Sequence, residues 1–180
     1  MLDELQHLID ALWAATTADE AIIAYLRATP VADLMNKTRW AWPISESVHF
    51  VGLALLIGII APLDVRLLGF MKGISIDALH RLVPWAVLGF VLNLITGLMF
   101  LAGTPEQYLG NVSWWFKVLF LIVAGLNMLA FELTQRAGAL AMPAHSGTPM
   151  TLKIIGAVSL TSWLMVLYWG RMLPFAGGAF

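Results

Sequence analysis

The sequence contains no cysteine in its 180 residues. Disulfide bonds, zinc–thiolate sites, iron–sulfur clusters and covalent c-type haem attachment are therefore excluded, because each of them requires a thiol. A metal or haem would have to be held by histidine, methionine, lysine or carboxylate side chains. Since the chain has only four histidines, few such sites can be built.

Charged residues are also scarce. They make up 12% of the chain, whereas soluble domains average about 25%. Hydrophobic residues make up 60%, and a soluble fold would expose too much of this apolar surface to water. The composition therefore predicts a protein of the lipid bilayer. A net charge of -1 leaves no basic patch for a nucleic acid, so we expect no nucleic-acid partner.

Four apolar runs are each long enough to cross a hydrocarbon core of about 30 Å. They cover residues 44–63, 79–102, 112–133 and 152–172, and the first is expected to continue as a helix past Asp64 and Arg66 to Leu68. The connections are short, which favours antiparallel packing of sequential helices. We therefore predict an all-α integral membrane protein, with an up-down four-helix bundle over residues 41–180.

Residues 1–40 are predicted to form amphipathic helices at the membrane interface. A helix over residues 2–15 would carry its apolar side chains at helical spacing. Thr17 and Glu20 have the spacing of a capping box for a second helix, which Pro30 would end before opening a further turn through Asn36.

Basic residues predict the orientation. The loop over residues 103–113 has no lysine or arginine, whereas the two loops on the other side hold Arg66, Lys72, Arg81, Arg136 and Lys153. We therefore expect a multi-pass protein of the bacterial inner membrane with both termini in the periplasm.

Polar residues near the outer end of the predicted spans indicate a site, because polar groups are costly in lipid. Glu46 and His49 share one face of the first span, and Lys117 lies at a similar depth in the third. The residues expected to converge there are Glu46, His49, Thr96, Met99, Lys117 and Tyr168. Alternatively, Lys117 could extend to the interface, and Glu46 could simply favour the positive end of its helix.

Two of the other histidines are not expected to complete this site. His80 and His145 fall on the opposite side of the membrane, where we expect them to be interfacial or solvated. A bis-histidine haem between facing spans is therefore not predicted. The possible partners of His49 are Met99, Lys117, Glu46 and, if the surface helix folds back, His7. A five-coordinate haem, or a copper ion held by His49 and a methionine, would also fit.

Small and amide side chains inside the spans favour helix packing. Asn93 and Asn127 are expected to form hydrogen bonds between helices. The stripe Gly89, Asn93 and Gly97, and the residues Gly156, Ser159 and Ser162, predict close approach of neighbouring helices.

Several motifs resemble an uncharacterised family of small bacterial membrane proteins with four transmembrane helices. The resemblance covers most of residues 40–172 and rests on residues 42–53, 64–69, 82–85, 96–97, 115–117 and 125–127. More distantly, the layout is similar to the membrane domains of CopD-type copper-resistance proteins and HemJ-type protoporphyrinogen oxidases. That similarity implies that His49 is a haem or metal ligand with Lys117 as its companion. The sequence departs from the HemJ pattern at Asn127, where that pattern leads one to expect a histidine after the lysine.

Three functions are compatible with these features. The first is a redox protein that holds haem b (or copper) through His49 and exchanges electrons with quinone or a periplasmic partner. The second is a non-catalytic membrane anchor or assembly subunit that docks a partner or forms a homo-oligomer. A small-molecule transporter is a third possibility, although no inverted repeat is evident.

Overall fold

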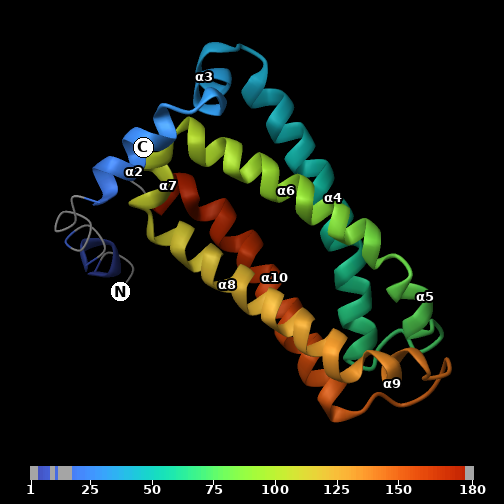
Figure 1. Ribbon diagram of the computed structural model, residues 1–180. Coiled ribbons are helices and arrows are strands. Elements are labelled where there is room, and N and C mark those ends of the chain that lie inside the picture. Colours follow the sequence, from blue (N-terminus) through green and yellow to red (C-terminus); the bar gives the residue numbers. More distant parts are fainter. Residues whose placement is uncertain (1–3, 9–10, 12–17, 177–180) are drawn as a thin grey trace. The chain divides into compact units, whose positions relative to one another are not determined.

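The chain folds into helices. The computed structural model describes residues 4–8, 11 and 18–176, and no β-strand occurs among these residues (Figure 1). Within this part of the chain, four helical segments are long and apolar enough to cross a membrane: Ala41–Leu67, Ile76–Gly103, Val112–Leu140 and Met150–Ala176. The all-α prediction is confirmed, and the four helices support a multi-pass membrane protein.

The helix bounds follow the local sequence signals. The elements are α2 (Ala18–Arg27), α3 (Pro30–Lys37), α4 (Ala41–Leu67), α5 (Ile76–His80), α6 (Val83–Gly103), α7 (Pro105–Leu109), α8 (Val112–Ala130), the π-helix η1 (Phe131–Gln135), α9 (Arg136–Leu140) and α10 (Met150–Ala176). Pro30 opens α3 as predicted, and the Thr29 side chain accepts a hydrogen bond from the backbone of Ala32. The helix α4 continues past Asp64, also as predicted.

The predicted helix over residues 2–15 and the predicted cap residue Thr17 fall largely outside the described residues. Within that range, residues 4–8 are helical.

The described helices expose apolar side chains, as expected for contact with lipid acyl chains. Large hydrophobic residues that are well exposed include Phe50, Val51, Leu98, Ile122, Leu133 and Ile154.

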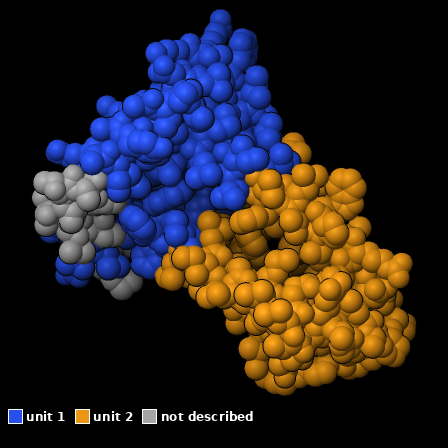
Figure 2. All heavy atoms as spheres, in the orientation of Figure 1, with its two compact units in different colours: residues 1–50, 92–118, 167–180 blue, residues 51–91, 119–166 orange. Residues whose placement is uncertain are grey.

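The chain divides into two compact units (Figure 2). Unit 1 comprises residues 1–50, 92–118 and 167–180, and unit 2 comprises residues 51–91 and 119–166. Each of α4, α6, α8 and α10 contributes residues to both units. The predicted boundary between residues 40 and 41 stays a prediction.

In unit 2, helix backbones approach closely at two glycines. A Cβ atom on Gly89 would lie 2.5 Å from the carbonyl oxygen of Gly52, and one on Gly156 would lie 2.9 Å from that of Asp64. Only glycine fits at such distances. The predicted close packing is confirmed at both positions. It is wrong at Gly97, where a Cβ would meet no atom within 4 Å.

Asn127 and the core complete unit 2. The Asn127 side chain of α8 donates a 3.1 Å hydrogen bond to the Ile155 carbonyl of α10. This contact confirms the predicted hydrogen bond between helices. The buried core lies nearby and consists of Leu63, Leu67, Ile76, Val83, Phe131, Ala139 and Leu152.

In unit 1, neutral side chains tie short helices and loops to the long helices. The Asn36 amide of α3 donates to the Gly103 carbonyl at 3.0 Å. The buried amide of Asn111 donates to the Leu173 carbonyl at 2.8 Å. These bonds satisfy carbonyl groups at helix ends that would otherwise lack a partner.

Candidate functional site

His49 is held by a directed hydrogen bond in unit 1. Its Nδ1 lies 2.7 Å from the Thr96 hydroxyl oxygen, and that hydroxyl lies 2.7 Å from the Leu92 carbonyl of its own helix. A carbonyl can only accept, so the hydroxyl proton goes to Leu92 and the hydroxyl oxygen accepts from His49. This arrangement favours the imidazole tautomer with a proton on Nδ1 and a free lone pair on Nε2.

Lys117 and Glu46 lie in the same unit. The positive charge of Lys117 interacts electrostatically with His49. The Lys117 ammonium lies alongside Gly170, since a Cβ atom added to that glycine would be 3.5 Å from Nζ. Glu46 acts on Tyr108 of the connecting segment. Burial, and then the negative charge of Glu46, raise the pKa of Tyr108 to about 12.

Met99 and Tyr168 belong to the same unit. Met99 lines a hollow together with Thr29 and Val31. Tyr168 is 48% exposed and packs edge-on against Trp169, with ring centroids 5.1 Å apart. The structure thus joins His49 to Thr96 and brings Lys117 within electrostatic range. The convergence of Met99 and Tyr168 on His49 stays a prediction. Among the described residues, no three histidine or carboxylate side chains gather as a metal-ligand set.

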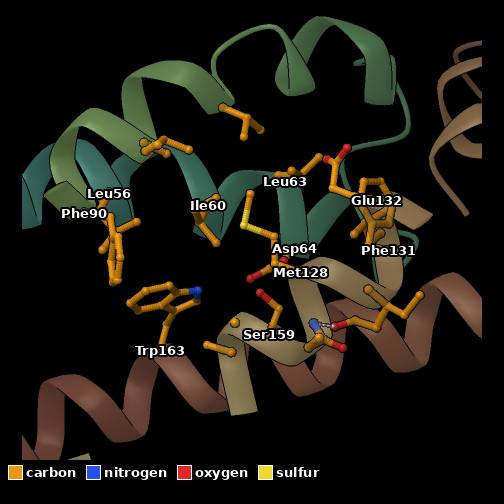
Figure 3. Close-up of a pocket in the computed structure, with 18 of the residues that line it drawn as sticks. Leu56, Ile60, Leu63, Asp64, Phe90, Met128, Phe131, Glu132, Ser159 and Trp163 are labelled. Carbon is orange, nitrogen blue, oxygen red and sulfur yellow. Dashed lines mark hydrogen bonds between the residues drawn. The ribbon is translucent and has the colours of Figure 1, made fainter. Parts of the chain in front are cut away.

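A second candidate site lies in unit 2. It is a cavity of about 150 Å³ whose wall is mostly apolar and comes from α4, α6, α8 and α10, with contributions from α5 and η1 (Figure 3). The polar side chains on this wall are Asp64, His80, Asn127, Glu132 and Ser159, and the aromatic ones are Phe90, Phe131 and Trp163. An apolar cavity with a few polar groups is the usual form of a small-molecule site.

Asp64 is the most unusual group on this wall. It is only 3% exposed, and the Ser159 hydroxyl, which lies beside it in Figure 3, forms a hydrogen bond with it. Its Oδ2 atom is buried and has no hydrogen-bond partner within the described chain. The ion pairs found in that same part of the chain do not include Asp64.

His80 and Glu132 form a polar pair on the same wall. The His80 Nε2 lies 2.8 Å from Glu132 Oε1, and Arg136 approaches the other carboxylate oxygen at 3.4 Å. Glu132 belongs to the π-helix η1, and such segments occur often at functional sites. The His80 side chain is 13% exposed and packs against Phe131. Of the two expectations for His80, interfacial or solvated, this burial disfavours the solvated one, and the interfacial one stays a prediction.

Arg66 is the other buried charge of unit 2. It lies in the last turn of α4, as the predicted continuation of the first helix past Arg66 requires, and it is 0% exposed. Its Nε donates to the Ile74 carbonyl at 2.7 Å and its Nη1 to the Thr148 hydroxyl at 3.1 Å. Its Nη2 has no partner among the described residues.

Sequence reasoning missed the unit 2 cavity. Asp64 was available as a signal, because it interrupts an apolar run, but we interpreted it as the polar end of a span. Ser159 was interpreted as a packing residue. Glu132 carried no signal, since the pairing with His80 joins residues 52 positions apart.

Comparison with known proteins adds no assignment. No protein family model, no curated protein and no solved structure matches the chain.

Proposed function

We propose that this chain is a redox protein of the bacterial inner membrane, an up-down four-helix bundle with both termini in the periplasm. In this proposal His49 binds the iron of a haem b, and the haem exchanges electrons with quinone or a periplasmic partner. The helices of residues 1–40 lie on the membrane surface next to that site.

The hydrogen bond between His49 and Thr96 carries the proposal. Histidines that bind metals usually donate their second ring proton to an oxygen, which fixes the tautomer and the ring orientation. His49 has this arrangement, since Nδ1 faces the Thr96 hydroxyl at 2.7 Å. Phe100 lies against the imidazole, with ring centroids 5.6 Å apart, and limits its rotation.

Lys117 supports haem over copper. A haem brings two propionates, and an ammonium within electrostatic range of His49 would offset one of those charges. A copper site would need a second soft ligand, and the sequence suggested Met99. Met99 lies beside Thr29 and Val31 in a hollow whose described lining does not include His49, so we favour haem. The resemblance to HemJ-type and CopD-type membrane domains agrees with a ligand role for His49.

Optical spectroscopy tests this proposal. The detergent-solubilised full chain is purified from cells supplied with iron and haem precursor, and spectra are recorded before and after dithionite reduction. We expect a Soret band that shifts on reduction. Metal analysis of the same sample reports copper.

Three variants make the test specific. His49→Ala is expected to abolish the Soret band, whereas His7→Ala, which changes an exposed histidine, leaves it intact. Thr96→Val should keep the haem but weaken its binding by about 10-fold or more. A wild-type protein without Soret absorbance, iron or copper would overturn the proposal.

A second candidate function is a non-catalytic anchor or assembly subunit. The observation that favours it is the set of large apolar side chains exposed on α2 and α3, namely Ile22, Tyr25, Val31 and Leu34. Such a surface fits a partner or a second copy of the chain as well as it fits lipid. This function predicts that His49→Ala assembles normally and that the oligomeric state or a co-purifying subunit changes when Tyr25→Ser and Leu34→Ser are combined.

A further inference from the structure

We propose that the cavity of unit 2 binds a small organic cation. Such a ligand has an apolar body of about the size of a benzene ring and carries a protonated amine. Asp64 is the group that recognises the charge. This site is separate from the one proposed around His49 and does not depend on it.

The electrostatic argument begins with Asp64. A buried carboxylate is costly unless a cation or hydrogen-bond donors compensate it. Ser159 supplies one hydrogen bond, but Oδ2 has no partner and no described lysine or arginine forms an ion pair with Asp64. The Arg66 guanidinium, two residues away in sequence, donates instead to Ile74 and Thr148. A ligand cation would supply the missing charge.

The remaining polar groups on the wall favour the same sign of charge. Glu132 adds a second carboxylate, whose interactions are with His80 and Arg136. The Asn127 amide is already used by the Ile155 carbonyl. Among the described residues, no lysine or arginine lines the cavity. An anionic ligand would therefore meet the carboxylates of Asp64 and Glu132 with no lysine or arginine on the wall to bind it, which disfavours such a ligand.

The rest of the cavity suits the body of such a ligand. Aromatic faces attract cations, and the wall includes Trp163, the best type of ring for this contact, together with Phe90 and Phe131. Phe90 and Trp163 pack edge to face, with centroids 6.3 Å apart. A cavity of about 150 Å³ is large enough for a benzene-sized molecule.

Calorimetric titration tests the proposal. The full chain is reconstituted in nanodiscs of zwitterionic lipid, which keeps non-specific attraction of cations low. Three probes of similar shape are titrated: benzylammonium, the neutral benzyl alcohol and the anionic benzoate. We expect benzylammonium to bind at least about 10-fold more tightly than benzyl alcohol, and benzoate not to bind.

Variants locate the binding. Asp64→Asn should weaken benzylammonium by about 30-fold or more while benzyl alcohol is unaffected. Asp77→Asn is the matched control, because it removes a carboxylate of unit 2 that pairs with Arg81 outside the cavity. His49→Ala should bind benzylammonium normally, which separates this proposal from the haem.

A filling variant covers the case in which Asp64→Asn does not fold. Gly125 lines the cavity, and a Cβ there would meet no atom within 4 Å. Gly125→Leu should therefore be tolerated and should abolish binding of both benzylammonium and benzyl alcohol. The proposal is overturned if wild type binds the cation no better than the alcohol, if Asp64→Asn binds the cation unchanged, or if Gly125→Leu still binds it.

Discussion

Unit 1 and unit 2 differ in the buried polar atoms that lack a partner. Among the described residues of unit 1 these atoms are hydroxyl oxygens, those of Thr104 and Ser113. In unit 2 they belong to charged groups, Asp64 Oδ2 and Arg66 Nη2. An unsatisfied charged group costs more than an unsatisfied hydroxyl. A ligand that satisfied these charged groups would therefore stabilise unit 2 more than a ligand of the hydroxyl groups would stabilise unit 1. Neutral hydrogen bonds connect the helices of unit 1.

Removing the buried guanidinium should have the largest effect. Arg66→Ala leaves the Ile74 carbonyl and the Thr148 hydroxyl without their donor and opens a void in a fully buried position. We expect the free energy of unfolding to fall by about 3 kcal/mol or more, measured by chemical unfolding in bicelles. Arg81→Ala, in an exposed pair with Asp77, should change it by less than about 1 kcal/mol. Equal losses in the two variants would contradict the difference in burial.

The second largest effect on stability is expected where two helices pack closely in unit 2, compared with an open glycine position in unit 1. Gly89→Ala in unit 2 places a methyl group 2.5 Å from a backbone oxygen, so we expect a loss of about 2 kcal/mol from overpacking. Gly97→Ala in unit 1 meets no neighbour and should leave stability unchanged or raise it slightly. Thermal unfolding of the two variants side by side gives the answer. A tolerated Gly89→Ala would show that the helices of unit 2 can move apart.

A neutral hydrogen bond of unit 1 should matter less than the Arg66 contacts. The buried Asn111 amide donates to Leu173, and its oxygen accepts from the backbone of Ser113. Asn111→Ala is expected to cost about 1–2 kcal/mol in the same chemical unfolding assay. Asn36→Ala removes an exposed amide with one bond and should cost less. If Asn36→Ala is the more damaging change, α3 is the stronger of the two attachments.

The smallest effect at neutral pH is expected at Tyr108. Its pKa is about 12 in the folded protein and about 10 when unfolded, so between these values the unfolded chain releases a proton that the folded chain keeps. Stability is therefore unaffected below pH 10 and falls as the pH rises from 10 to 12. Tyr108→Phe should flatten this decline in a pH series of melting temperatures. Tyr25→Phe, an exposed tyrosine, should not.

The sequence predicted those features that depend on residues near in the chain. The lengths of the four apolar segments, the start of α3 at Pro30 and the continuation of α4 past Asp64 follow from local composition and helix signals. The hydrogen bond donated by the Asn127 side chain was also predictable, because an amide in lipid must find an acceptor on a neighbouring helix.

The features that were missed depend on how each helix is oriented about its own axis, which decides the side chains that face a neighbour. Hydropathy is high all around α4 and α10, so the pattern did not indicate that Asp64 and Ser159 face one cavity. It also did not indicate that His80 meets Glu132, since the π-helix η1 changes the direction of the side chains after Ala130. For the same reason Gly97 was assigned to a close helix contact that Gly89 makes and Gly97 does not.

That π-helix also lets one apolar stripe continue along the third span. Phe131 and Ala139 belong to the same buried core although eight residues separate them. In an uninterrupted α-helix this spacing rotates the second side chain by roughly 80° from the first, and one extra residue in a wider turn reduces the offset to roughly 20°. The phase of the helix is thus reset by a single residue. A relative that lacks this residue would have to present a shifted set of apolar positions in the sequence after residue 135 to build the same core.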